Sequence, residues 1–392
     1  MKYPFNPEML DALPEKVAAH FRTLETDLIV KICEQIATGR INEVSVQAMR
    51  ALRSQGINLT DIINAIQRYS GMADKELAEL FDEVIRRNQA YYSDVITLAD
   101  ITAPERLVDA AEIETIRRQT MAEFENISRS MGFIINGQFL KPEKVYTAVL
   151  DQAIISVQAG TTDYNKALFA AVKQLADSGI RTIDYNTGHV DMADVAARRA
   201  IMTGVTQINA RYAEQAAEYL DTDLVEVSAH AGARNIGLMP ENHELWQGKV
   251  YRWSQKTNPN SPQSTGSYPD FIQSCGYGSG EGIEGWNCRH QFYPFVEGVS
   301  ERTYTDAELQ KLTAKQFTYQ GKQYDTYNAS QRQRQIERTI RKYKREKAAF
   351  EAAGMKDEAA ATTARIRALN VEYKLFSKAA GLPMQAARMK VI

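Results

Sequence analysis

The stretch that decides the fold class is residues 14–39, PEKVAAHFRTLETDLIVKICEQIATG. Its large apolar side chains recur at spacings of three and four, which places them on one face of an α-helix: Val17, Phe21, Leu24, Leu28, Ile32 and Ile36. Pro14 suits the first turn of such a helix, and Gly39 stands where it should end. The stretch therefore predicts an amphipathic helix.

The same spacing continues through the first third of the chain. One run follows Asp74, with apolar residues at Leu77, Leu80, Phe81, Val84 and Ile85. Another lies beyond Pro104, with Leu107, Ile113, Ile116 and Phe124. We expect residues 1–132 to form a helical region whose apolar faces make either an ordinary bundle core or a docking face.

The periodicity then changes. In residues 133–140, FIINGQFL, two short apolar runs flank Asn-Gly, a pair that favours a tight hairpin turn. Helices are predicted over 145–157, 164–176 and 192–220, and short strands over 224–227 and 249–253. Between residues 258 and 298 the chain is rich in Gly, Pro, Ser and Asn, and a loop of that length is more often functional than idle.

The C-terminal part returns to helix. Residues 317–324 are typical of one more hairpin, Ser330 is a candidate cap for a helix running toward Gly354, and a partner helix is predicted over 357–380. The fold class predicted is α+β and predominantly helical. Its expected domains are a helical region 1–132, an α+β core 133–300 and a basic helical hairpin 301–392.

Composition limits the classes of function. The 392 residues carry 47 basic and 49 acidic side chains, a net charge of −2, so no overall field recruits nucleic acid or a membrane. Three cysteines make no disulfide framework and indicate a reducing compartment, and no apolar run approaches the length of a membrane span. We expect a protein made in the cytoplasm, with no membrane partner.

The histidines and cysteines gather in one window. His230, His243 and His290 lie there with Cys275 and Cys288, and thiolate and imidazole are the usual zinc ligands. A structural zinc held by Cys275, Cys288, His290 and either His243 or His230 is one hypothesis. In the alternative, His243, Asn287 and Arg289 only hydrogen-bond the loops together.

Two catalytic interpretations use the same residues. Cys288 could act as a nucleophile with His243 or His290 as its base, or the histidines could serve a zinc-dependent nuclease. Residues 280–285 match G-x-G-x-x-G, but no strand precedes them and no helix follows, so we reject a dinucleotide site. We expect these glycines to let the backbone turn tightly beside other groups.

One segment is strongly basic within a nearly neutral chain. The candidate DNA-binding residues are Arg332, Arg334, Arg338, Arg341, Lys342, Lys344, Arg345 and Lys347. Such a helix can neutralise phosphates without reading sequence, or it can be an ordinary solvated face balanced by acidic groups.

Four short motifs in order carry a family resemblance: SAHAGAR at 228–234, NHELWQGKV at 242–250, GYG at 276–278 and GWNCRH at 285–290. The chain resembles the phage minor capsid protein 2 family, which is similar to the Mu F-like head morphogenesis proteins. The matching positions are His230, Arg234, His243, Trp246, Gly248, Asn287, Cys288, Arg289 and His290. Mu F-like proteins tend to end the last motif in Cys-Arg-Cys, whereas this chain has His290, which keeps a candidate metal ligand.

The resemblance implies a minor capsid protein of the virion, not an enzyme. Its implied place is the portal vertex inside the capsid, with the portal protein and other capsid proteins as partners. Its implied role is head assembly and packaging or delivery of double-stranded DNA, with docking through the N-terminal helices. The competing interpretations are a virion-packaged zinc-dependent nuclease or cysteine hydrolase, and a scaffolding protein removed before maturation.

Overall fold

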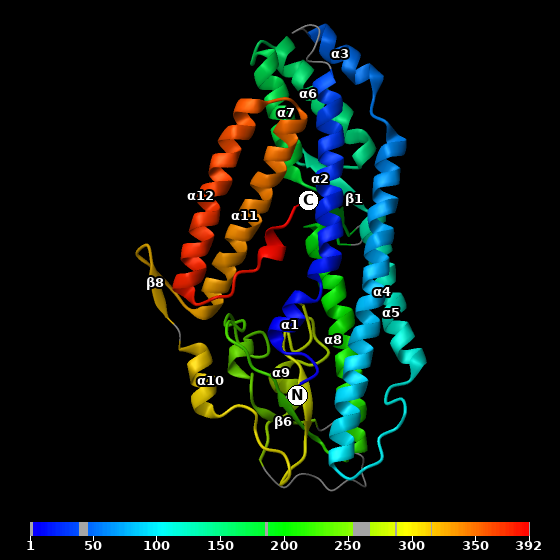
Figure 1. The fold of residues 1–392 in the computed structure, drawn as a ribbon, viewed down its shortest axis with the longest axis vertical. Helices are drawn as coiled ribbons and strands as arrows, with labels where there is room; N and C mark the ends of the chain where they lie inside the picture. Colours follow the sequence, from blue (N-terminus) through cyan, green and yellow to red (C-terminus); the bar gives the residue numbers. More distant parts are fainter. Residues whose placement is uncertain are drawn as a thin grey trace. The chain divides into compact units, whose positions relative to one another are not determined.

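The computed structural model describes residues 3–38, 46–184, 187–253, 267–286, 288–314 and 316–391. Helices dominate it, with short antiparallel strands between them (Figure 1), so the predicted α+β, predominantly helical class is confirmed. The helices are α1 (Pro7–Ala12), α2 (Glu15–Thr38), α3 (Val46–Gln55), α4 (Leu59–Leu98), α5 (Ala110–Arg129), α6 (Pro142–Gln158), α7 (Tyr164–Ser178), α8 (Ala193–Tyr219), α9 (Phe271–Cys275), α10 (Asp306–Thr313), α11 (Thr326–Ala352) and α12 (Lys356–Ala380). The described residues also form the 3-10 turns η1 (His243–Leu245) and η3 (Ala386–Met389).

In the part of the chain that the structure describes, the strands form three small antiparallel sheets. The strands are β1 (Met131–Ile135), β2 (Gln138–Leu140), β3 (Arg181–Ile183), β4 (Val190–Met192), β5 (Leu224–Val227), β6 (Val250–Arg252), β7 (Phe292–Phe295), β8 (Phe317–Tyr319) and β9 (Lys322–Tyr324). Their orders are β2-β1-β3-β4, β6-β5-β7 and β8-β9. In the β6-β5-β7 sheet, Val227 of β5 pairs with Phe292 of β7, and Leu224 pairs with Phe295.

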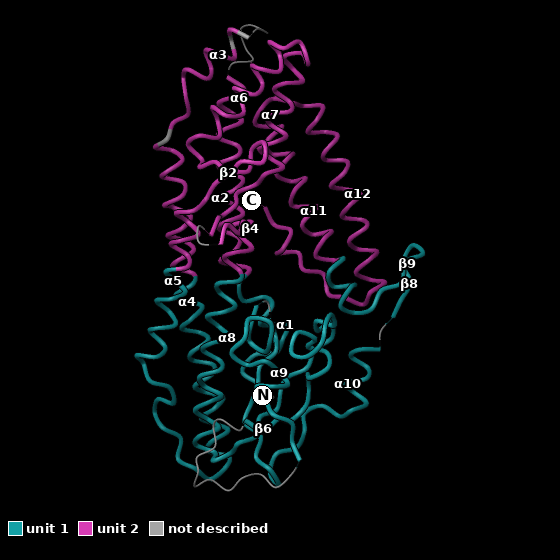
Figure 2. The backbone as a smooth tube through the Cα atoms, turned by 180° about the vertical axis from the view of Figure 1, so that it is seen from behind, with its two compact units in different colours: residues 1–14, 77–122, 199–332 teal, residues 15–76, 123–198, 333–392 magenta. Residues whose placement is uncertain are grey.

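The chain divides into two compact units, coloured separately in Figure 2. Unit 1 contains residues 1–14, 77–122 and 199–332, and unit 2 contains residues 15–76, 123–198 and 333–392. Each unit thus combines three separate stretches, whereas the predicted domains 1–132, 133–300 and 301–392 are consecutive. The compact units group residues by contact and the predicted domains group them by sequence order. The predicted domain boundaries therefore stay a prediction.

Unit 2 contains the amphipathic helix predicted within residues 14–39, which is α2. The apolar face of α2 is buried, with Leu28, Ile32 and Ile36 fully shielded from solvent. The predicted Asn-Gly hairpin joins β1 to β2, and both turn residues, Asn136 and Gly137, have the positive φ that such a turn requires.

Helices α11 and α12 lie side by side and antiparallel (Figure 1). The Tyr373 hydroxyl donates to Glu337 Oε1 at 2.9 Å, and Gln333 Nε2 donates to Ser377 Oγ at 2.9 Å, both in buried positions. Helix α12 ends at Gly381 in the left-handed conformation, as the sequence predicted.

In unit 1, Tyr91 of α4 packs against Tyr293 of β7, and α5 packs against α8. Gly204 of α8 allows a close approach, because a Cβ there would stand 2.4 Å from Thr120 Oγ1 and 2.9 Å from the Phe81 ring. Asn88 Nδ2 donates to Asn209 Oδ1 at 2.6 Å in the same interior. The unit therefore has its own tightly packed core.

Three local predictions differ from the structure. The helix expected near Asp74 is part of the much longer α4, because neither Asp74 nor Gly71 interrupts it. Asp325, rather than Ser330, caps α11 by accepting from the Asn328 N–H at 2.7 Å. Strand β7 was not predicted, because a short, almost wholly buried run shows no polar alternation. Within the described residues, no helix is long and apolar enough to span a membrane.

Candidate metal centre

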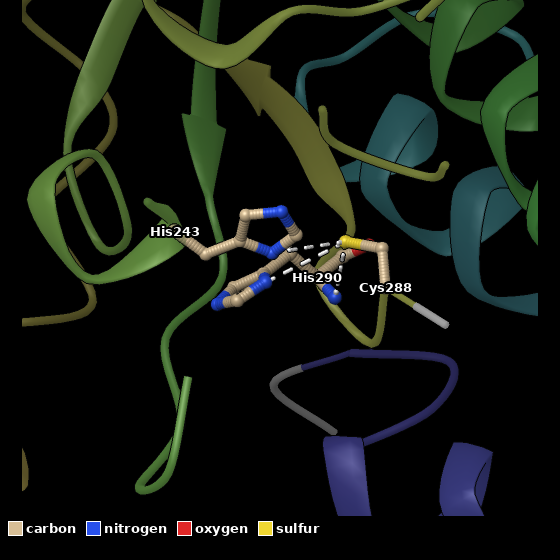
Figure 3. Close-up of side chains that lie close together, drawn as sticks. All are labelled: His243, Cys288 and His290. Atoms are coloured by element: carbon tan, nitrogen blue, oxygen red, sulfur yellow. Dashed lines mark hydrogen bonds between the residues drawn. The ribbon is translucent and has the colours of Figure 1, made fainter. Parts of the chain in front are cut away.

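Three side chains from the predicted Cys/His window meet inside unit 1 (Figure 3). Cys288 Sγ lies 3.8 Å from His243 Nδ1 and 3.6 Å from His290 Nδ1. All three candidate ligand atoms lie within 4.8 Å of one another. Among the described His, Cys, Asp and Glu residues, this is the one group with metal-ligand spacing, and all its members are buried.

Sheet pairing and a tight turn place these residues. Strand β7 pairs with β5. At the residue before β7, Gln291 O accepts from the Ser228 N–H at 2.8 Å, and the Gln291 N–H donates to Ser228 Oγ at 2.9 Å. This fixes His290, the next residue toward the N-terminus. His243 begins the 3-10 turn η1, and its ring packs on buried Trp246, with centroids 4.6 Å apart.

Hydrogen bonds fix which nitrogen of each ring carries the proton. The Gln247 Oε1 atom accepts from the His230 backbone N–H, so His290 Nε2, 3.1 Å away, is its second donor. His243 Nε2 lies 2.8 Å from the Glu281 carbonyl oxygen, which can only accept. In both neutral rings the lone pair is therefore on Nδ1, the atom that faces Cys288 Sγ.

The surroundings keep these groups uncharged in the absence of a cation. Burial lowers the pKa of His243 to about 4 and lowers that of His290 well below its ordinary value. Burial also raises the pKa of Cys288 to about 11, against the opposing pull of backbone hydrogen bonds and of Arg234. A cysteine nucleophile needs an accessible thiolate, and Cys288 is 2% exposed, so the site does not favour the cysteine hydrolase.

The other motif residues hold loops around this centre. Arg234 Nη2 donates to the Trp286 carbonyl at 3.2 Å, and Arg289 Nη2 donates to the Gly232 carbonyl at 3.4 Å. The His230 ring stacks on His290, with centroids 4.3 Å apart. Trp246 Nε1 donates to Pro240 O at 2.8 Å.

Gly248 adopts a positive φ of 68°, and a Cβ there would stand 2.3 Å from a Leu309 methyl carbon. Asn287 lies outside the described residues. The motif therefore combines a buried His/Cys group with hydrogen bonds to loop carbonyls, and the structural zinc stays a prediction.

Cys275, the remaining predicted ligand, is not in the group. Its buried side chain lies by Tyr251, and its carbonyl accepts from the Ile283 N–H at 2.7 Å. The glycines act as expected: a Cβ on Gly282 would stand 2.1 Å from Gly276 O. The structure thus assembles three of the four predicted ligands, and the glycine loop packs its backbone against the segment that contains Cys275.

The basic residues of α11 hold contacts inside unit 2. Arg345 is buried and pairs with Glu25 at 2.9 Å, while Arg341 pairs with Asp194 at 3.5 Å and donates to Arg388 O. Further partners are Asp177 for Lys342, the Met389 carbonyl for Lys344 and Glu351 for Lys347.

The remaining three of the eight candidates are less buried than Arg345. Arg338 is exposed, while Arg332 and Arg334 are half-buried. Much of the predicted DNA-binding set is therefore an ion-pairing face of the fold.

Sequence reasoning missed two residues that organise these sites. Gln247 orients both His230 and His290, and it lies within the NHELWQGKV motif, which was the available signal. Glu25 was missed because its role is to pair with Arg345, which lies far along the chain.

The comparisons with known proteins point to one class, the phage structural proteins. A "Structural protein" of Lactococcus phage LL-H is 23% identical over 359 residues, which cover 89% of each chain. A "Structural protein" of Lactococcus phage mv4 is 33% identical over 112 residues, or 27% of this chain and 76% of the relative. No solved structure gives a significant match.

The chain belongs to the phage minor capsid protein 2 family, whose model matches residues 5–376. The family resemblance found in the sequence motifs is thereby confirmed. As a phage structural protein, the chain is a component of the virion with other capsid components as partners. That it has no enzymatic activity stays a prediction.

Proposed function

We propose that this minor capsid protein acts at the portal vertex, inside the capsid, in head assembly and in packaging or delivery of the genome. The observation that carries the proposal is the family match from residue 5 to residue 376, which covers most of both compact units. The portal location is supported by the resemblance of motifs 228–290 to Mu F-like head morphogenesis proteins.

The architecture supports an assembly role over catalysis. A buried ion pair links Glu25 to Arg345 within unit 2. The His/Cys group is shielded from solvent and brings η1 together with residues 288–290. These features stabilise a shape, whereas a nuclease or hydrolase needs an accessible reacting group.

Docking through the N-terminal helices needs a test that leaves the fold intact. Residues 1–14 and 77–100 belong to unit 1 and residues 15–76 to unit 2, so deletion of the first hundred residues would remove packing from both units. Substitutions of exposed residues can test docking without removing this packing. On α4, Ile63 is 53% exposed and Met72 is 41% exposed.

The experiment is co-purification of the tagged full chain with co-expressed portal protein. The variant Ile63→Glu/Met72→Glu should lose the portal protein, because it places charge on two exposed apolar residues of an N-terminal helix. The matched control Val371→Glu/Leu375→Glu alters two similarly exposed residues of α12 and should retain it. A wild-type chain that does not retain the portal protein would overturn the proposal, and equal retention by both variants would overturn docking through α4.

A further inference from the structure

The three atoms that meet in the His/Cys group cannot all be satisfied by one another. His243 Nδ1 and His290 Nδ1 each present a lone pair to Cys288 Sγ, because their Nε2 hydrogens are committed to Glu281 O and Gln247 Oε1. A thiol has one hydrogen to donate. Of the two Nδ1 atoms facing the sulfur, one is therefore left without a donor from Cys288, in a buried place.

A bound cation would resolve this conflict. The Sγ···Nδ1 separations of 3.6 and 3.8 Å are close to the roughly 3.5 Å between ligand atoms around a tetrahedral zinc with bonds of about 2.0–2.3 Å. A protein group that accepts the other ring N–H is the usual support for a metal-bound histidine. Here Glu281 O and Gln247 Oε1 already supply that support on both rings.

We propose that His243 Nδ1, Cys288 Sγ and His290 Nδ1 bind one divalent ion with the ligand preference of zinc. On binding, the Cys288 thiol loses its proton to solvent, the thiolate and the two neutral imidazoles donate to the ion, and no electron is transferred. Three protein ligands leave one tetrahedral position for water. The ion would join η1 to residues 288–290, which connect the glycine-rich segment to β7, and so stabilise a loop-rich part of unit 1.

The proposal goes beyond the portal-vertex function and does not depend on it. It differs from the sequence hypothesis in its ligand set, because Cys275 is excluded and His230 stacks on a ligand ring instead of binding. That exclusion supplies a matched control, since Cys275 and Cys288 are both buried cysteines of unit 1.

The test uses the purified full chain, loaded with zinc under reducing conditions and freed of excess metal by gel filtration. Elemental analysis should find about one zinc per chain in the wild type and in Cys275→Ser, and only background in Cys288→Ser and in His290→Asn. Removal of the zinc by a chelator should lower the melting temperature of the wild type and leave that of Cys288→Ser unchanged. Absence of bound zinc from the wild type, or equal zinc in Cys288→Ser, would overturn the proposal.

A second measurement does not depend on whether the variants fold. Cobalt added to the metal-free wild type should produce a thiolate-to-cobalt charge-transfer band, which reports a metal-sulfur bond directly. Zinc should abolish the band by displacing cobalt. A wild-type chain that binds cobalt without this band would rule out Cys288 as a ligand.

Discussion

Replacement of Arg345 by methionine should destabilise unit 2 strongly. The arginine side chain is almost fully buried, its Nη1 bonds Glu25 Oε2 at 2.9 Å and its Nε donates to Ala176 O at 3.3 Å. Methionine keeps an unbranched apolar stem but leaves the Glu25 carboxylate buried without its cation. The Glu25 side chain is held in this interior, because its Oε1 accepts from the Ile180 N–H at 2.8 Å.

The magnitude follows from the cost of an uncompensated buried charge. Removal of one partner from a buried ion pair typically costs about 3–5 kcal/mol of unfolding free energy. Burial already raises the pKa of Glu25 despite the attraction of Arg345, so the variant can limit its loss by protonating the carboxyl. For a cooperative unit of this size, a loss of about 3–5 kcal/mol corresponds to a fall in melting temperature of roughly 6–20 °C.

The assay is thermal and urea unfolding followed by circular dichroism at neutral pH. The matched control is Arg338→Met on the same helix, where the side chain is exposed and the change should stay within about 0.5 kcal/mol. Adding Glu25→Gln to Arg345→Met should recover part of the stability, because the unpaired charge is gone. An Arg345→Met variant within 1 kcal/mol of wild type, or strictly additive effects in the double variant, would refute the reasoning.

Four further predictions address other parts of the molecule. Gly204→Ala should lower the free energy of unfolding by about 1–3 kcal/mol, because its Cβ would collide with Thr120 and Phe81. Gly71→Ala lies in open space on α4 and should raise it by about 0.5–1 kcal/mol, and urea unfolding measures both changes. In metal-free protein, the free energy of unfolding should fall as pH drops from about 6.5 toward 4, because the unfolded chain then binds a proton that folded His243 excludes. The melting temperature, measured against pH, should therefore fall less steeply in His243→Asn. Native protein should show no rapidly reacting thiol toward a disulfide reagent, and three after denaturation, because all the cysteines are buried; a fast native phase would contradict this. If α11 contacts DNA, Arg338→Glu should reduce the slope of log affinity against log salt by about one, and an unchanged slope would argue against that contact.

Local features of the fold were predictable where neighbouring residues determine them. The α2 stripe from Val17 to Ile36, the Asn136-Gly137 turn and the Gly381 helix end all depend on nearby spacing or on backbone conformation, and each is found in the structure. Strand β7 was not predictable in this way, because its four residues are defined by pairing with β5, over sixty positions away.

In the candidate sites too, local features were predictable and long-range contacts were not. The motifs revealed which residue types gather between 230 and 290, but only the structure separates Cys288 from Cys275 as a partner of the histidines. Charge density on α11 indicated a cationic face, yet the pairing of Arg345 with Glu25 depends on a contact between residues 320 positions apart. Long-range contacts of this kind leave no local periodicity in a sequence.

The most direct test of the central claim is to locate the protein in mature phage particles. Asymmetric reconstruction of particles carrying a labelled full chain, with the copy number measured by quantitative mass spectrometry, would show its place. We predict the intact chain in low copy number, with its density at a single vertex inside the shell. Absence of the chain from mature particles, or density spread over the whole capsid lattice, would contradict the portal-vertex assignment.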